Sequence, residues 1–278
     1  MNNSKSFLFL VPLTPSRLMT PLRSLLFEQF LKGLQSQRYE NWSAILIGEH
    51  EGTEGKVKYC RIMAESKEIK LIFAMQYLLS LEVKPDYIIR MDDDDIINPS
   101  IIQKVSTLTF DCFADRYHVF YDVLSGNIST QKRDFLANTV IHKYEHAIKA
   151  VGPDQTPLIQ SDHSFWIDYY RDKNLVYTAP SFPVYLRVLS PTTVTNGIHE
   201  AEGSISVRYS FFRENVTKMK TFADIDIQAY LSYLSTHGKF RYKRLAPFSI
   251  VIEHLDAVWL KFSGQKRRGQ ILRILGLS

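Results

Sequence analysis

Cysteine is scarce in this chain, with only Cys60 and Cys112 among 278 residues. Two cysteines build neither a disulfide framework nor a cysteine-rich zinc site, so we expect a reducing, cytoplasmic setting. Long apolar runs are also missing, because charges, glycines or prolines interrupt every stretch before the ~18 residues that a membrane-spanning helix requires. The apolar residues 7–11 are followed by Pro12 and by no small-residue cleavage site, which favours a buried strand over a signal peptide. We therefore expect a chain that does not span a bilayer.

Glycine and proline, at 12 and 11 residues, are too few for a collagenous or low-complexity chain. The composition is instead 45% hydrophobic, 13% aromatic and 23% charged. That much apolar surface can offset the entropy of ordering the chain, whereas a disordered chain lacks it. The sequence therefore predicts a packed globular protein, and it contains no internal repeat.

The net charge of +5 is concentrated at one end of the chain. Residues 239–278 carry nine basic and two acidic residues, a net charge of +7, which leaves −2 for the rest. A body without excess positive charge argues against a nucleic-acid partner. We expect residues 237–278 to form a basic amphipathic extension, in which residues 266–277 are the better candidate for peripheral contact with an anionic membrane. The alternative is a last helix docked on the body.

Short apolar runs alternate with helical patterns through the first half of the chain, which is typical of βαβ units and a mostly parallel sheet. The predicted fold class is therefore α/β. Further along, a hairpin, two more helices and an extended segment follow. The expected strands are 7–11, 44–47 and 87–91, with a short apolar element at 57–63. The expected helices are 21–35, 68–81, 100 onward, 135–151 and 162–170. The hairpin is 116–124 with 127–133, and the extended segment is 176–188.

Four consecutive aspartates, residues 92–95, follow the buried strand at 87–91 directly. Ligands bind at the carboxyl ends of strands in open α/β sheets, which is where this run would lie. Adjacent carboxylates repel one another unless a cation neutralises them, and hard oxygen ligands select Mg²⁺ or Mn²⁺. Because residues i and i+2 of an extended segment point the same way, Asp92 and Asp94 could share one metal. The alternative is a solvated acidic loop that caps the helix after Pro99.

The segment 86–99 resembles the strand and DxDD motif of the GT-A glycosyltransferases, and its Arg-Met-Asp-Asp-Asp-Asp form is closest to a bacterial rhamnosyltransferase-like group. Residues 9–14 and 37–47 resemble the first and second strands of inverting members, and the likeness continues weakly to about residue 200. The resemblance implies a GT-A fold with a central, mostly parallel sheet flanked by helices. It also implies a catalytic domain over residues 1–236, with a nucleotide-sugar-binding half at 1–110 and an acceptor-side half at 111–236.

The same resemblance implies roles for individual residues around the acidic run. Asp92 would contact the donor ribose or a metal-bound water, and Asp94 would bind the cation that bridges the diphosphate. Glu49 would read the base. Asp95 would support Arg90 or an acceptor. The residues implied to bind the nucleotide sugar are Pro12, Thr14, Arg17, Glu49, Arg90, Asp92 and Asp93.

Inverting glycosyl transfer requires a base for the acceptor hydroxyl, so a second carboxylate must lie downstream. Asp162 resembles the acidic residue at the start of the acceptor-side helix in these enzymes, with Trp166 one turn later on the acceptor side. It also fits a simple helix N-cap. His199 resembles the histidine that many GT-A enzymes place on the metal, and imidazole is a plausible further ligand. Its alternative is an ordinary surface histidine.

Residues 142–146 fit the H-x-x-E-H pattern of inverted zinc proteases. So short a motif arises by chance, and we interpret its histidines as the solvated face of a helix. The sequence predicts a glycosyltransferase with a divalent cation, a nucleotide-sugar donor and a glycan or lipid-linked acceptor. The alternatives are a sugar-phosphate nucleotidyltransferase, although its usual Gly-rich loop is absent at residues 12–17, and a binding protein that retains the fold without turnover.

Overall fold

The computed structural model describes residues 4–19, 21–64, 66–122, 127–179 and 181–189. His199, the proposed extension at 237–278 and the domain boundary at 236 lie outside these residues, so those expectations stay predictions. The described chain belongs mainly to one compact unit, which contains residues up to 119 and 130–187. Residues 120–129 and 188–189 belong to a second unit. No helix of the described part is long and apolar enough to cross a membrane.

An eight-stranded sheet forms the centre of the larger unit, in the order β13-β7-β10-β5-β1-β2-β4-β3. β1, β2, β4 and β5 are mutually parallel neighbours, β13 is parallel to β7, and β10 runs antiparallel between β5 and β7. This confirms the α/β class and the mostly parallel sheet flanked by helices expected of a GT-A-like fold. The strands are β1 (Phe7–Pro12), β2 (Trp42–Gly48), β3 (Gly52–Glu54), β4 (Val57–Arg61), β5 (Tyr87–Arg90), β7 (Cys112–Asp115), β10 (Ile141–Lys143) and β13 (Leu175–Thr178).

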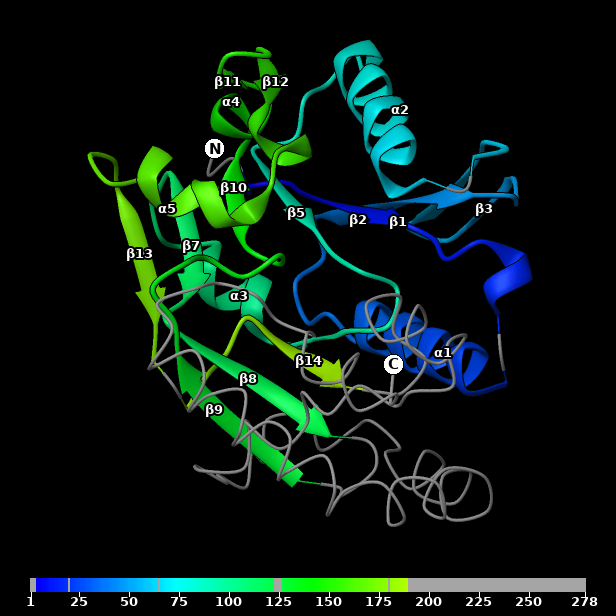
Figure 1. Cartoon of the computed structure of the whole chain (residues 1–278), viewed down its shortest axis with the longest axis horizontal. Coiled ribbons are helices and arrows are strands. Elements are labelled where there is room, and N and C mark those ends of the chain that lie inside the picture. The colour runs from blue at the N-terminus through cyan, green and yellow to red at the C-terminus, as the bar shows by residue number, and fades with distance from the viewer. Residues whose placement is uncertain (1–3, 20, 65, 123–126, 180, 190–278) are drawn as a thin grey trace, which may run out of the picture. The chain divides into compact units, whose positions relative to one another are not determined.

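Helices cover both faces of this sheet (Figure 1). The strand residues alternate between the two faces, as the pleat requires. Phe7, Phe9 and Val11 pack in one core with α1 (Pro21–Gln35) and α3 (Ile101–Val105), whereas Leu8 and Leu10 pack in another with α2 (Lys67–Ser80). Burial on both faces explains why β1 is a continuous apolar run.

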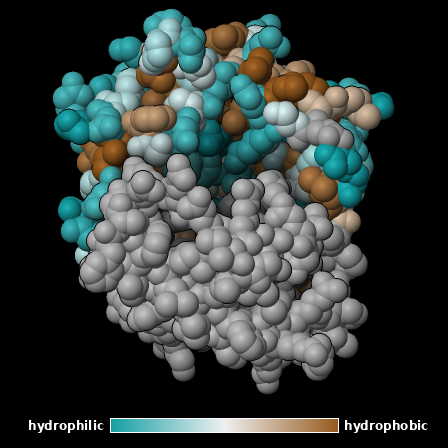
Figure 2. Space-filling model, viewed as in Figure 1, coloured by the Kyte–Doolittle hydropathy of each residue, from teal (hydrophilic) through white to brown (hydrophobic). Residues whose placement is uncertain are grey.

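The outer side of helix α2 carries apolar residues among polar ones, whereas the side that faces the sheet is mostly apolar. Leu71, Met75 and Leu78 are buried, while Ile69 and Leu79 are about half exposed at 49% and 57%. Hydrophobic residues lie among hydrophilic ones on the described part of the face in Figure 2. α2 therefore packs on the sheet through its buried side, which includes Met75 and Leu78.

The region 135–151 is not the single helix that its apolar spacing predicts. It contains β10, the short helix α4 (Tyr144–Ala147) and β11 (Ala150–Val151), which pairs with β12 (Thr156–Pro157). The β-branched Ile141 suits a strand, and the pairing of β10 with β5 and β7 outweighs the helical spacing.

The predicted extended segment 176–188 is two strands rather than one. β13 lies in the central sheet, and β14 (Tyr185–Leu189) pairs antiparallel with β6 (Ile96–Ile97) in a second sheet. That sheet also contains β8 (Tyr117–Asp122) and β9 (Asn127–Lys132), the strands of the predicted hairpin. Pro183, which has no N–H to donate, lies between β13 and β14. The predicted helix at 162–170 is present as two turns, η3 (His163–Phe165) and α5 (Trp166–Tyr169).

Candidate active site

The acidic run forms a turn at the carboxyl end of β5, where Asp95 N–H donates to the Asp92 carbonyl at 3.4 Å. Carboxylate oxygens of Asp92, Asp94 and Asp95 lie within 4.8 Å of one another. Asp93 points elsewhere, because both of its oxygens accept hydrogen bonds from Thr14. Three converging hard oxygen donors suit Mg²⁺ or Mn²⁺, so these residues fit the expected cation.

Arg23 and Lys67 form ion pairs with carboxylates of this run. Arg23, on α1, donates to Asp93 Oδ1 at 3.0 Å and to Asp94 Oδ2 at 3.2 Å. Lys67, at the start of α2, pairs with Asp92. Both side chains lie in the first turn of a helix, where the helix dipole disfavours a cation. A basic residue at a helix N-terminus is therefore a signal in the sequence that could have pointed to Arg23 and Lys67.

The carboxylates of the run differ in their acidity. Burial alone would raise the pKa of Asp92, but the positive charges of Lys67, Arg90 and Arg187 together outweigh it and lower that pKa to about 2. Burial raises the pKa of Asp94 to about 6, and the charges of Asp93 and Asp92 add to the rise while Arg23 opposes it. A further cation beside Asp94 would therefore favour the ionised form of this carboxylate.

The loop after β1 lies against the acidic run. The Thr14 amide donates to Asp93 Oδ2 at 2.6 Å, and its hydroxyl donates to Asp93 Oδ1 at 3.0 Å. Glu49, just past β2, accepts the Ser16 amide at 3.0 Å, and these Ser16 hydrogen bonds lower the pKa of Glu49. Pro12 is buried at the end of β1, and Arg17 is exposed in the 3-10 turn at Ser16–Leu18. The structure therefore brings Thr14 to Asp93 and places Glu49 beside the same loop.

Arg90, the last residue of β5, is buried and fully engaged. Its guanidinium donates to Asn138 Oδ1 at 2.9 Å, to the Ile159 carbonyl at 2.6 Å and to the Ser161 carbonyl at 3.2 Å. It also lies 4.9 Å from the ring centroid of Trp166. Arg90 thus ties the end of the strand that precedes the acidic run to the segment that leads into Asp162.

Asp162 caps the turn that follows it, because its Oδ1 accepts the Ser164 amide at 2.8 Å. This hydrogen bond lowers the pKa of Asp162, so the carboxylate is ionised at neutral pH. Asp162 is exposed, whereas Trp166 is fully buried and donates its Nε1–H to the Leu158 carbonyl and to Ser161 Oγ, both at 2.9 Å. Trp166 therefore supports Arg90 and the 158–161 segment from the core.

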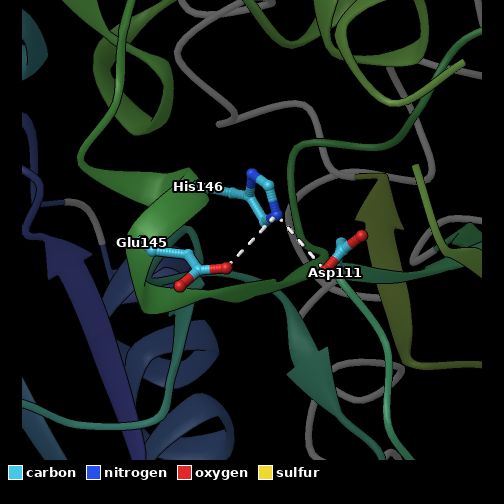
Figure 3. Close-up of side chains that lie close together, drawn as sticks. All are labelled: Asp111, Glu145 and His146. Atoms are coloured by element: carbon cyan, nitrogen blue, oxygen red, sulfur yellow. Dashed lines mark ion pairs between the residues drawn. The ribbon is translucent and has the colours of Figure 1, made fainter. Parts of the chain in front are cut away.

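The H-x-x-E-H motif does not form one helical face, which corrects the interpretation of its histidines as solvated. His142, on β10, is fully buried and its Nδ1 lies 2.8 Å from the Tyr170 hydroxyl. His146, on α4, points its Nε2 toward Asp111 Oδ1 at 3.2 Å and Glu145 Oε1 at 3.8 Å (Figure 3). The two histidines therefore face different surroundings, as chance occurrence of the motif implies.

Burial of His142 predicts a pH effect on stability. Burial, together with the charges of Arg90 and His146, lowers the pKa of His142 to about 3, against about 6.5 in an unfolded chain. Below pH 6.5 only the unfolded state takes up this proton, so the stabilising contribution is complete above pH 6.5 and is lost toward pH 3. Between pH 6 and 4 we expect the free energy of unfolding of the wild type to fall relative to His142→Gln by about 1.4 kcal/mol per pH unit.

Urea unfolding at several pH values measures that difference, in which the other titrating groups cancel. His50→Gln, at an exposed histidine, is the matched control and should run parallel to the wild type. Parallel curves for His142→Gln and the wild type would contradict the prediction.

No protein-family model matches the sequence, and no curated protein matches it. Among solved structures, the chain is similar to S. aureus TarS 1–349, with 12% identity and a TM-score of 0.43 over 85% of this chain and 74% of that one. It is also similar to the glycosyltransferase GlyE of Streptococcus pneumoniae TIGR4 (11% identity, TM-score 0.40, 84% and 64%). A third is a 4-diphosphocytidyl-2C-methyl-D-erythritol synthase (12% identity, TM-score 0.43, 72% and 98%). These are likenesses of fold.

Proposed function

We propose that the protein is a metal-dependent glycosyltransferase that moves a sugar from a nucleotide-diphosphate donor to a hydroxyl of a glycan or lipid-linked acceptor, with inversion, in surface polysaccharide synthesis. The observation that carries this proposal is the acidic turn at the carboxyl end of β5, where Asp92, Asp94 and Asp95 converge. In open parallel sheets this edge is where ligands bind. The setting would be the cytoplasm, with the basic extension at 237–278 in contact with the membrane.

The donor side of the site consists of the acidic turn and the loop after β1. Asp94, with Asp92 and Asp95 beside it and His199 as a further ligand, would hold Mg²⁺ or Mn²⁺. When bound, such an ion neutralises the charge that develops on the departing diphosphate. Glu49 would face the base. The residues proposed to surround the nucleotide sugar are Pro12, Thr14, Arg17, Arg90 and Asp93.

Asp162 is proposed as the base on the acceptor side. It would accept the proton of the acceptor hydroxyl while the acceptor oxygen bonds to the anomeric carbon and the bond from that carbon to the diphosphate breaks. Arg90 links Asp162 to the acidic turn, because this last residue of β5 donates to the carbonyl of Ser161, next to Asp162, at 3.2 Å. Arg90 and the buried Trp166 would act as positioning residues for Asp162.

A sugar-phosphate nucleotidyltransferase is disfavoured by the hydrogen bonds of the loop after β1. Phosphate cradles are built from backbone N–H groups that point at the ligand. Here the Thr14 amide donates to Asp93 and the Ser16 amide to Glu49. These amides are therefore engaged within the protein, and no glycine occurs at residues 12–17.

Replacement of Asp162 tests the proposed reaction. For Asp162→Asn we expect kcat for release of nucleoside diphosphate from the donor sugar to fall about 10²- to 10⁴-fold with KM for the donor unchanged, because Asn cannot accept the proton. A panel of nucleotide sugars, with water or glycan as acceptor, supplies the substrate. The Asn side chain can still accept the Ser164 amide, so the cap is retained.

Asp168→Asn is the matched control, since Asp168 is an exposed aspartate on the neighbouring α5 whose partner is Arg171. It should leave kcat unchanged. Equal activity of the two variants would exclude Asp162 as the base. Release of pyrophosphate from a nucleoside triphosphate and a sugar phosphate would instead establish the nucleotidyltransferase, and turnover of neither substrate class would favour a binding protein.

A further inference from the structure

Arg23 joins three parts of the candidate donor site through one guanidinium. Its Nη2 donates to Asp93 Oδ1 at 3.0 Å and to the Thr14 hydroxyl, and its Nη1 donates to Asp94 Oδ2 at 3.2 Å. The Arg23 side chain is only 5% exposed. Helix α1, the loop after β1 and the acidic turn thus meet at this side chain.

These contacts determine which carboxylates of the turn converge. Both oxygens of Asp93 accept hydrogen bonds from Thr14 or Arg23, which turns Asp93 away from the cluster. Asp94 gives one oxygen to Arg23 and still lies within the cluster that it forms with Asp92 and Asp95. The hydrogen bond from Arg23 therefore helps to set the orientation of Asp94 within the turn.

The chemistry of arginine suits this arrangement better than that of lysine. A planar guanidinium presents several N–H donors in a fixed fork, whereas an ammonium is a point charge. Lys67 shows the contrast, because among the described residues its ion pair is with Asp92, and its side chain is 45% exposed. Arg23 is accordingly the buried cation with several hydrogen bonds to the site, and Lys67 is the more exposed one.

We propose that Arg23 is a positioning residue of the donor site, which fixes Asp94 and Thr14 in the arrangement that binds the divalent cation and the nucleotide diphosphate. This inference rests on the proposed function. It predicts whether removal of Arg23 raises or lowers the affinity for Mn²⁺. A guanidinium that acted only through its charge would repel the metal, so its removal would tighten Mn²⁺ binding. Loss of a positioning residue should weaken that binding.

Electron paramagnetic resonance of free Mn²⁺, with and without a nucleoside diphosphate, measures this directly on the full chain. For Arg23→Lys and Arg23→Gln we expect Mn²⁺ affinity to fall about 10- to 100-fold, the usual effect of losing a group that orients a metal ligand. Thr14→Val, which removes one acceptor of the fork, should weaken binding in the same direction. Arg171→Lys, at an exposed arginine, is the matched control and should bind as the wild type does.

The outcomes separate this inference from the proposed function. Equal or tighter Mn²⁺ binding by Arg23→Gln, with the wild type binding metal and nucleotide, would overturn the role of Arg23 and leave the glycosyltransferase proposal intact. Binding of neither ligand by the wild type would overturn both. Circular dichroism checks the fold of each variant. If both Arg23 variants unfold, unchanged binding by Thr14→Val would overturn the inference.

Discussion

Asp94→Asn is expected to abolish manganese-dependent binding of the nucleoside diphosphate, with a loss of affinity of about 100-fold or more. Losing a group that merely orients a metal ligand costs 10- to 100-fold, so losing a ligand should cost at least as much. Asp94 is the central candidate because burial and its acidic neighbours raise its pKa to about 6, which a bound cation would reverse. The Asn side chain can still accept a hydrogen bond from Arg23, so the turn should fold.

Isothermal calorimetry with UDP, GDP, CDP and dTDP, with and without Mn²⁺, measures this effect and identifies the base. Asp154→Asn, at an exposed aspartate in the turn before β12, should bind as the wild type does. Nucleotide binding that is the same in chelator, or the same in Asp94→Asn, would contradict the donor-site assignment. The acidic turn would then have a structural role.

Arg90→Met is expected to lower the free energy of unfolding by about 3–5 kcal/mol. Methionine keeps an apolar stem but removes every donor of the guanidinium. Asn138 Oδ1 and the carbonyls of Ile159 and Ser161 then lose the hydrogen bonds that they accept from Arg90. A buried acceptor that loses its donor costs about 1–3 kcal/mol. The packing of the guanidinium against the Trp166 ring is lost as well.

Urea denaturation followed by tryptophan fluorescence measures the stability change. Arg171→Met is the control, because Arg171 is exposed and its pair with Asp168 should contribute less than about 1 kcal/mol. The same midpoint for Arg90→Met and the control would show that the buried network does not stabilise the fold. Because Arg90 holds the carbonyl that precedes Asp162, donor turnover should fall together with stability.

Strong local patterns predicted most of the elements around the site. The apolar runs that become β1, β2 and β5 are buried on both faces, and such runs read clearly in a sequence. The amphipathic patterns of α1 and α2 predicted their bounds to within one or two residues. The cap at Asp162 was also visible, because capping depends only on a residue and the next few positions.

The failures occur where pairing partners are distant in the chain. Residues 135–151 have apolar spacing that suits a helix, yet β10 forms because β5 and β7 leave a position between them in the sheet. Likewise, 176–188 divides between two sheets because β13 pairs with β7 and β14 with β6. Local spacing carries no information about which strands are available as neighbours.

The sequence by itself determined the α/β class, the position of the acidic run at the end of a buried strand, and Asp162 as a cap. These features depend on periodicity and on short-range spacing. Only the tertiary structure decided that Asp93 turns to Thr14 and Arg23, that Arg90 and Trp166 support the Asp162 segment, and that His142 is buried. The reason is that such contacts join residues far apart in the chain, and their geometry exists only once the helices and strands have packed.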